Sequence, residues 1–193
     1  RALQRSRIGK AMSRPETRQL VLPTYLGLVK QIDDHLGRLF NELEQLGRLD
    51  DTLVVFTSDH GEYMGDHWMG EKDWINEEVV RVPMIIVDPR SGADVTRGTT
   101  SNELVEAIDL LPTFVEALGG ENETRKQWLE GESLLPVLHG ERGTRREFVV
   151  CEADWGFLEM ANHLGETNEP RRRRATMLRN DRFKYVLSEI GPN

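Results

Sequence analysis

The chain has 193 residues, 38% hydrophobic and 30% charged, which is typical of a globular domain with a sizeable core. Its net charge of −8 argues against general nucleic-acid binding, and its single cysteine, Cys151, excludes a disulfide within the chain. No apolar stretch is long enough to span a bilayer, and the basic residues 1–15 lack the apolar centre of a secretory signal, so we expect a cytoplasmic protein without a membrane partner.

Residues 1–15 predict an irregular lead-in, and residues 16–47 predict the longest helix of the chain. Apolar residues recur in this second segment at steps of three and four, which is the pattern of an amphipathic helix. Pro23 should mark the start of the helix or a kink, and Gly47 is suited to end it. The apolar stripe consists of Leu28, Ile32, Leu36, Leu39, Leu43 and Leu46.

A short apolar run over residues 53–57 predicts a strand that is buried on both faces of a parallel sheet. It is followed at once by Asp59 and His60, at the end of the strand where open α/β sheets bind their ligands. A carboxylate oxygen and an imidazole nitrogen together suit a divalent metal such as Mn, Fe or Zn. Gly61 then provides the conformational freedom for a turn.

A structural alternative exists, because Ser-Asp after a strand is often a turn or a helix N-cap. The context favours a functional site, since two histidines, His60 and His67, and several charged residues fall in one window of 14 residues. A turn or a helix N-cap alone would not explain two histidines in this window.

Beyond this window, residues 74–80 predict a short helix and residues 84–87 a second buried strand. This order suggests a right-handed parallel crossover between the two strands. A further helix is predicted to end near Leu118, with Asp109 as its N-cap, followed by Gly119.

The last part of the chain predicts a strand over residues 147–151, a long loop over residues 153–174 and a hairpin over residues 175–187. The turn of the hairpin would be formed by Asn180 and Asp181. The basic run of residues 171–174 is interpreted as part of the solvated loop rather than as a phosphate-binding patch.

The segment TSDHGEYMGDHWMGEK, followed by VRVPMIIVDP, resembles the sulfatase branch of the alkaline phosphatase superfamily, above all the phosphonate monoester hydrolases. The resemblance implies an alkaline phosphatase-like α/β fold, with a mainly parallel sheet flanked by helices and a small antiparallel sheet at the C-terminus. Residues 1–145 would form the C-terminal part of the catalytic domain, and residues 146–193 the small antiparallel segment.

The same resemblance implies roles for four residues. Asp59 and His60 match the pair that binds the catalytic divalent metal, which could be Mn, Ca, Fe or Zn. Lys72 matches a lysine that contacts the anionic ester group of a small-molecule substrate, and His67 could orient a ligand or protonate a leaving group. The implied reaction is metal-dependent hydrolysis of sulfate esters or of phosphonate or phosphate esters.

The nucleophile of the family is not found in these residues. Sulfatase-like enzymes use a formylglycine made from Cys or Ser in the motif Cys/Ser-x-Pro-x-Arg, and Cys151 is followed by Glu-Ala-Asp-Trp. We therefore expect the chain to be the C-terminal part of a longer enzyme, inactive when isolated and able to form a homo-oligomer. The alternatives are a non-catalytic binding or assembly module, and a phosphomutase or phosphodiesterase of the same superfamily.

Overall fold

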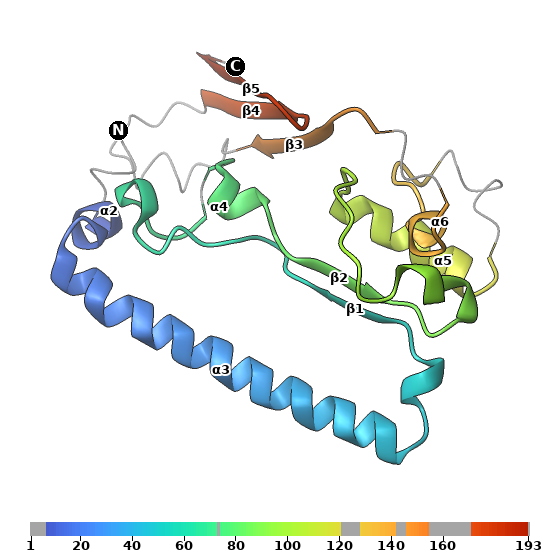
Figure 1. Cartoon of the computed structure of the whole chain (residues 1–193). Helices are drawn as coiled ribbons and strands as arrows, with labels where there is room; N and C mark the ends of the chain where they lie inside the picture. Colours follow the sequence, from blue (N-terminus) through green and yellow to red (C-terminus); the bar gives the residue numbers. More distant parts are fainter. Residues whose placement is uncertain (1–6, 73, 121–127, 142–145, 155–170, 193) are drawn as a thin grey trace.

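The computed structural model describes residues 7–72, 74–120, 128–141, 146–154 and 171–192 (Figure 1). Two sheets organise them: a pair of strands, β1 and β2, and a three-stranded sheet in the order β3-β4-β5. A long helix, α3, and a group of short helices lie on opposite sides of the β1–β2 pair (Figure 1). Along these residues, no helix combines the length and the apolar character needed to cross a membrane.

The long helix is present as predicted. It is α3, Pro15–Gln45, with Pro15 in its first turn and Gly47 behind its end at a φ of 64°. Pro23 lies inside the helix, so of its two predicted roles the start of the helix is wrong and the kink stays a prediction. The predicted irregular lead-in is also wrong, since it contains a helix, α2, Arg7–Met12. The apolar stripe is not packed, because none of the 31 residues of α3 is buried.

The first two strands are β1, Val54–Thr57, and β2, Met84–Val87. Their predicted parallel arrangement is wrong, since Val54 pairs with Val87 and Thr57 with Met84 in an antiparallel ladder. The connection between them, residues 58–83, contains one short α-helix, α4, Glu77–Val80, and does not cross over to the start of the sheet. The connecting loop therefore leaves and returns at the same end of the strand pair.

The second group of helices follows β2. Its main helix is α5, Leu110–Ala117, which Gly119 ends at a φ of 79°. Asp109 precedes α5 but does not cap it with its side chain; its carboxylate accepts bonds from the backbone N–H groups of Glu106 and Glu132 and from both terminal nitrogens of Arg146. The remaining short helices are α6, Leu135–Leu138, and the 3₁₀ turns Leu49–Asp51, Asp66–Trp68, Ser91–Thr96 and Ala107–Asp109.

The C-terminal sheet is antiparallel, as predicted. Its strands are β3, Val149–Asp154, β4, Arg171–Arg179, and β5, Lys184–Pro192. The predicted loop over residues 153–174 was too long at both ends, because residues 153–154 belong to β3 and residues 171–174 to β4; residues 155–170 lie outside the described residues. The turn between β4 and β5 is held by the Asn180 side chain, which accepts bonds from two backbone N–H groups, those of Arg182 and Phe183.

The C-terminal sheet and the loop after β1 share a small core. Ile75, Ala175 and Met177 are at most 4% exposed and pack together, with Val149 and Cys151 partly buried against them. Ile75 comes from the loop, and the others come from the sheet. The sheet is therefore attached to the segment in which the sequence predicts the site.

Candidate active site

The candidate site begins where β1 ends. Directly after Thr57, the Ser58 hydroxyl donates to the carbonyl oxygen of His60 at 2.7 Å, and the His60 N–H donates to Asp59 Oδ1 at 3.0 Å. The Gly61 N–H donates to the carbonyl oxygen of Val79 at 2.7 Å. The first two bonds form a tight turn that presents Asp59 and His60 at the end of the strand. The third bond ties this turn to α4.

The structure brings three of the four predicted site residues together. His60 Nε2 lies 3.3 Å from Asp59 Oδ2, and the Lys72 ammonium lies 2.6 Å from the same nitrogen. Lys72 is twelve residues beyond His60 in the sequence, so the loop between them folds back on itself. Asp59, His60 and Lys72 thus form one cluster of an anion, an imidazole and a cation.

Hydrogen bonds define the tautomer of His60. Its Nδ1 lies 2.8 Å from the carbonyl oxygen of Gly61, which can only accept, so Nδ1 carries the proton. Nε2 then has a free lone pair, and the Lys72 ammonium donates to it. Nε2 is the atom with which His60 can bind a metal ion.

The donor set fits part of a divalent metal site. Two ligands at the bond lengths usual for zinc lie about 3.0–3.4 Å apart around one ion, and Asp59 Oδ2 and His60 Nε2 are separated by 3.3 Å. An oxygen and a nitrogen donor suit Mn, Fe or Zn. Within the ranges that the structure describes, no group of three or more His, Cys, Asp or Glu side chains could hold a metal ion.

The carboxyl of Asp59 is held in its charged form. Desolvation, the largest single effect, raises its pKa, but the backbone N–H of His60 and the positive charge of nearby Lys72 together with the other lowering effects outweigh it, and the net pKa lies below the ordinary value. The Asp59 side chain is 83% exposed, so its carboxylate is accessible to a ligand in solution.

Backbone strain is concentrated in the loop that returns Lys72 to His60. Among the described residues, every non-glycine residue with a positive φ lies here: Met64, His67, Trp68 and Glu71, with values of 50–65°. Such conformations cost about 1 kcal/mol or more each, and they cluster at functional sites. Two backbone bonds hold the loop closed, from Tyr63 N–H to the Glu71 carbonyl at 3.2 Å and from Gly65 N–H to the Met69 carbonyl at 2.9 Å.

The fourth predicted residue, His67, has a different partner. Its Nε2 lies 3.1 Å from Glu78 Oε1 in α4, and its ring meets the ring of buried Tyr63 edge-on at 6.1 Å. Because a carboxylate can only accept, Nε2 carries the proton of this bond. Glu78 thus fixes the orientation of the His67 ring and holds its Nε2 proton.

Sequence reasoning assigned no site role to Glu78, or to Asn76, whose side-chain oxygen accepts a bond from the Tyr63 hydroxyl at 2.9 Å. The only indication in the sequence was that both residues belong to the short helix predicted over residues 74–80. That helix did not indicate the partners of their side chains. Contacts across eleven or more residues depend on how the loop folds.

Comparison with known proteins gives a consistent result. The family described as Sulfatase matches residues 6–120. Over 130 residues, the chain is 43% identical to the multifunctional alkaline phosphatase superfamily protein PehA of Trinickia caryophylli, covering 67% of this chain and 24% of that protein. Over 137 residues it is 36% identical to an N-acetylglucosamine-6-O-sulfatase of Bacteroides thetaiotaomicron, covering 71% of this chain and 22% of that protein.

Among solved structures, the phosphonate monoester hydrolase of Agrobacterium radiobacter matches with a TM-score of 0.76 and 31% identity, over 91% of this chain and 34% of that one. This likeness supports the alkaline phosphatase-like α/β fold with a small antiparallel C-terminal sheet. The chain spans about a quarter of the length of these two relatives and about a third of the solved structure.

Proposed function

This chain belongs to the sulfatase family, and on that basis we propose that it forms part of a metal-dependent hydrolase of sulfate esters or phosphonate esters. The observation that carries the proposal is the convergence of Asp59, His60 and Lys72 at the end of β1. The names of the similar proteins, which include a sulfatase and a phosphonate monoester hydrolase, support the same class of reaction.

In this proposal, Asp59 Oδ2 and His60 Nε2 are two ligands of the metal ion. When bound, a divalent ion of this kind stabilises negative charge on an ester oxygen as a Lewis acid. The bond from His60 Nδ1 to the Gly61 carbonyl keeps the imidazole in the required tautomer and orientation.

Lys72 supplies a positive charge to an oxygen of the anionic ester. Its ammonium bonds to His60 Nε2 in this structure, so it would leave that lone pair when a metal ion binds there, and its flexible side chain would then turn to the substrate. His67 is proposed to orient a ligand or to protonate a leaving oxygen; because Glu78 holds the Nε2 proton, the transferred proton would come from Nδ1 of the imidazolium, which Glu78 stabilises.

We propose that the nucleophile, a formylglycine in the family, lies outside these 193 residues, together with the remaining metal ligands. Two observations support this: Cys151 does not begin the motif Cys/Ser-x-Pro-x-Arg, and the relatives are about three to four times as long as the matched region. Residues 1–145 would then contribute to the catalytic domain, and residues 146–193 would add an accessory sheet.

The test uses the longest protein that contains this chain. Bound metal is measured by elemental analysis, and hydrolysis is measured with an aryl sulfate and a phenyl phosphonate ester. Asp59→Asn and His60→Ala should both lower the metal content. Lys72→Ala should keep the metal but slow turnover by about 10²–10³, which is typical when one charge-stabilising group is lost.

Three outcomes would contradict the proposal. Full metal content and full activity in Asp59→Asn and His60→Ala would show that these residues are not ligands. Phosphoryl transfer between substrate hydroxyls without net hydrolysis would favour a phosphomutase, and the absence of any turnover in a metal-loaded protein would favour a non-catalytic module.

A further inference from the structure

The C-terminal sheet presents two basic side chains to the loop that carries the candidate site. Arg179 of β4 and Lys184 of β5 are directly opposite each other in the strand ladder, next to the turn that Asn180 holds. Both reach Glu77 Oε1, Arg179 Nε at 3.2 Å and Lys184 Nζ at 3.0 Å. Lys184 is more than one hundred residues from Glu77 in the sequence, so this is a tertiary link.

Glu77 is the first residue of α4, and α4 contacts the candidate site at three points. The Val79 carbonyl accepts the bond from Gly61 N–H, the Glu78 carboxylate accepts the bond from His67, and Asn76, which precedes the helix, accepts the bond from Tyr63. A displacement of α4 therefore changes the turn next to His60 and the orientation of His67 together.

The link combines charge with apolar packing. Two residues before Glu77, Ile75 packs against Ala175 and Met177 of β4. The side chains of Arg179 and Lys184 are 29% and 24% exposed, so their attraction to Glu77 is less screened than that of a fully solvated pair. Partial burial raises the pKa of Glu77, but Lys184, Arg179 and Arg81 outweigh this effect, so the pKa is lowered and the carboxylate stays charged.

From these contacts we infer that Glu77 is a positioning residue, through which the C-terminal sheet holds α4 and thereby sets the geometry of His60 and His67. The inference rests on the hydrolase proposed above. It gives the C-terminal sheet an indirect part in the reaction, through α4, although none of its residues belongs to the site.

The experiment again uses the longest protein that contains this chain. Glu77→Gln preserves the shape of the side chain but removes its charge, and Glu77→Lys reverses the charge. Loss of a partly exposed charge pair should lower kcat about two- to fivefold in Glu77→Gln, more in Glu77→Lys, with little change in KM. The double variant Glu77→Lys with Lys184→Glu should recover part of the loss, which would identify the charge pair rather than the shape of residue 77 as the cause.

A second readout does not depend on activity. Hydrogen exchange of the peptide covering residues 58–64 reports the bond from Gly61 to Val79, and this peptide should exchange faster in both single variants. If the wild-type protein hydrolyses no ester, the proposed function fails, and the exchange measurement still decides whether Glu77 holds the loop.

The matched control is Asp154→Asn. Asp154 pairs with Arg174 at 2.9 Å in the same C-terminal sheet, and both side chains are more than half exposed. This variant should leave kcat and the exchange of residues 58–64 unchanged. The inference is overturned if Glu77→Lys leaves both readouts at wild-type values, if Asp154→Asn changes them equally, or if the charge-swapped pair recovers nothing.

Discussion

At the scale of single residues, Asp88 is one of two buried carboxylates among the described residues, together with Asp109. Its side chain has no exposed surface, and its carboxylate accepts bonds from Arg90 Nε at 2.8 Å, Arg90 Nη2 at 2.7 Å and His139 Nε2 at 2.9 Å. It follows β2 directly, so these bonds tie the end of the strand to the residue that follows α6. The hydrogen bonds from Arg90 hold the pKa of Asp88 well below its ordinary value of 3.8, against the opposing effect of burial.

The Asp88 carboxylate should therefore contribute an acid-sensitive part of the stability. Because its pKa is lower in the folded than in the unfolded protein, this stabilisation is complete above the unfolded pKa and is lost as the pH falls below about 4. Asp88→Asn should lower the free energy of unfolding at pH 7 by about 1.5–3 kcal/mol. Urea unfolding from pH 7 to pH 3 should show a smaller acid-induced loss in the variant than in the wild type.

The control for this prediction is Asp94→Asn. Asp94 also pairs with an arginine, Arg97, at 2.8 Å, but its side chain is 62% exposed. An exposed pair contributes at most about 1 kcal/mol. Equal effects of the two substitutions at pH 7 would contradict the role assigned to Asp88.

At the scale of elements, the candidate site depends on the close approach of the turn after β1 to α4. Gly61 was expected to allow a special backbone turn, and the structure gives a different reason for glycine there. A Cβ atom at this position would lie 1.9 Å from the backbone carbonyl oxygen of Glu78. The two segments can approach this closely only because residue 61 has no side chain.

Gly61→Ala should force these two segments apart. Overpacking of this kind typically costs about 1–3 kcal/mol, and the bond between Gly61 N–H and the Val79 carbonyl should weaken at the same time. Denaturant unfolding measures the first effect, and hydrogen exchange of residues 58–64 measures the second.

Gly37→Ala in α3 is the matched control, since nothing lies within 4 Å of a Cβ atom there. Alanine in a helix interior is favoured over glycine by about 0.5–1 kcal/mol, so this variant should be slightly more stable than the wild type. If Gly61→Ala keeps the wild-type free energy of unfolding and the wild-type hydrogen exchange of residues 58–64, the loop tolerates a side chain at this position, contrary to the structure.

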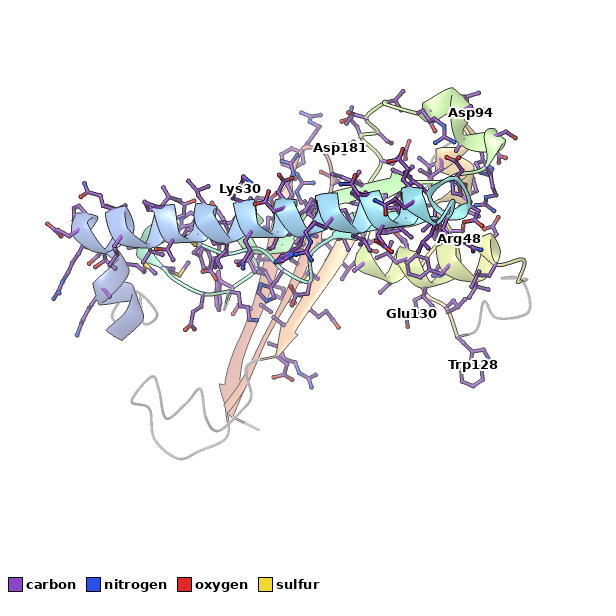
Figure 2. The ribbon with its side chains drawn as sticks, turned by 90° about the horizontal axis from the view of Figure 1, so that it is seen from below. Lys30, Arg48, Asp94, Trp128, Glu130 and Asp181 are labelled. Atoms are coloured by element: carbon purple, nitrogen blue, oxygen red, sulfur yellow. The ribbon has the colours of Figure 1, made fainter. Side chains whose placement is uncertain are left out.

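At the scale of the whole molecule, the chain leaves much apolar surface uncovered. A compact protein of this mass exposes about 9,300 Å², whereas this chain of 22.1 kDa exposes 14463 Å². The side chains of α3 project from all sides of the helix, and Trp128 points away from the ribbon (Figure 2). Large exposed apolar residues lie on α3 and on both strands of the β1–β2 pair, among them Leu20, Leu22, Leu26, Leu28, Val29, Ile32, Leu39, Phe56, Ile85 and Val87.

We therefore expect the 193-residue chain to self-associate when it is produced alone. Exposed apolar patches of this size favour association, and Leu22, Leu26 and Val29 of α3 are each 47–57% exposed at steps of four and three residues. Sedimentation velocity should show species larger than the monomer, and replacing these three residues with Glu should shift the distribution towards the monomer.

Added charge alone must be separated from the loss of apolar surface. Replacing Gln19, Gln31 and Gln45 of the same helix with Glu adds the same three charges but removes no apolar side chain. This control should still associate. A monodisperse wild-type monomer would count against the proposed missing segment and favour a complete small domain.

The sequence alone determined the parts of the fold that depend on local interactions. The three- and four-residue spacing of apolar positions identified α3, the apolar runs identified β1 and β2, and Asn180 identified the C-terminal hairpin, because each pattern acts within a few residues. The motif beginning at Asp59 indicated the place of the candidate site for the same reason. Its residues are close together in the chain.

The tertiary structure decided what depends on distant contacts. Strands with similar apolar runs can pair in either direction, and only the ladder that pairs Val54 with Val87 shows that β1 and β2 are antiparallel rather than parallel. The pairing of His67 with Glu78 and the link from Glu77 to Arg179 and Lys184 join residues 11 to 107 positions apart. No periodicity encodes such pairs, since each forms only when packing brings two separate segments together.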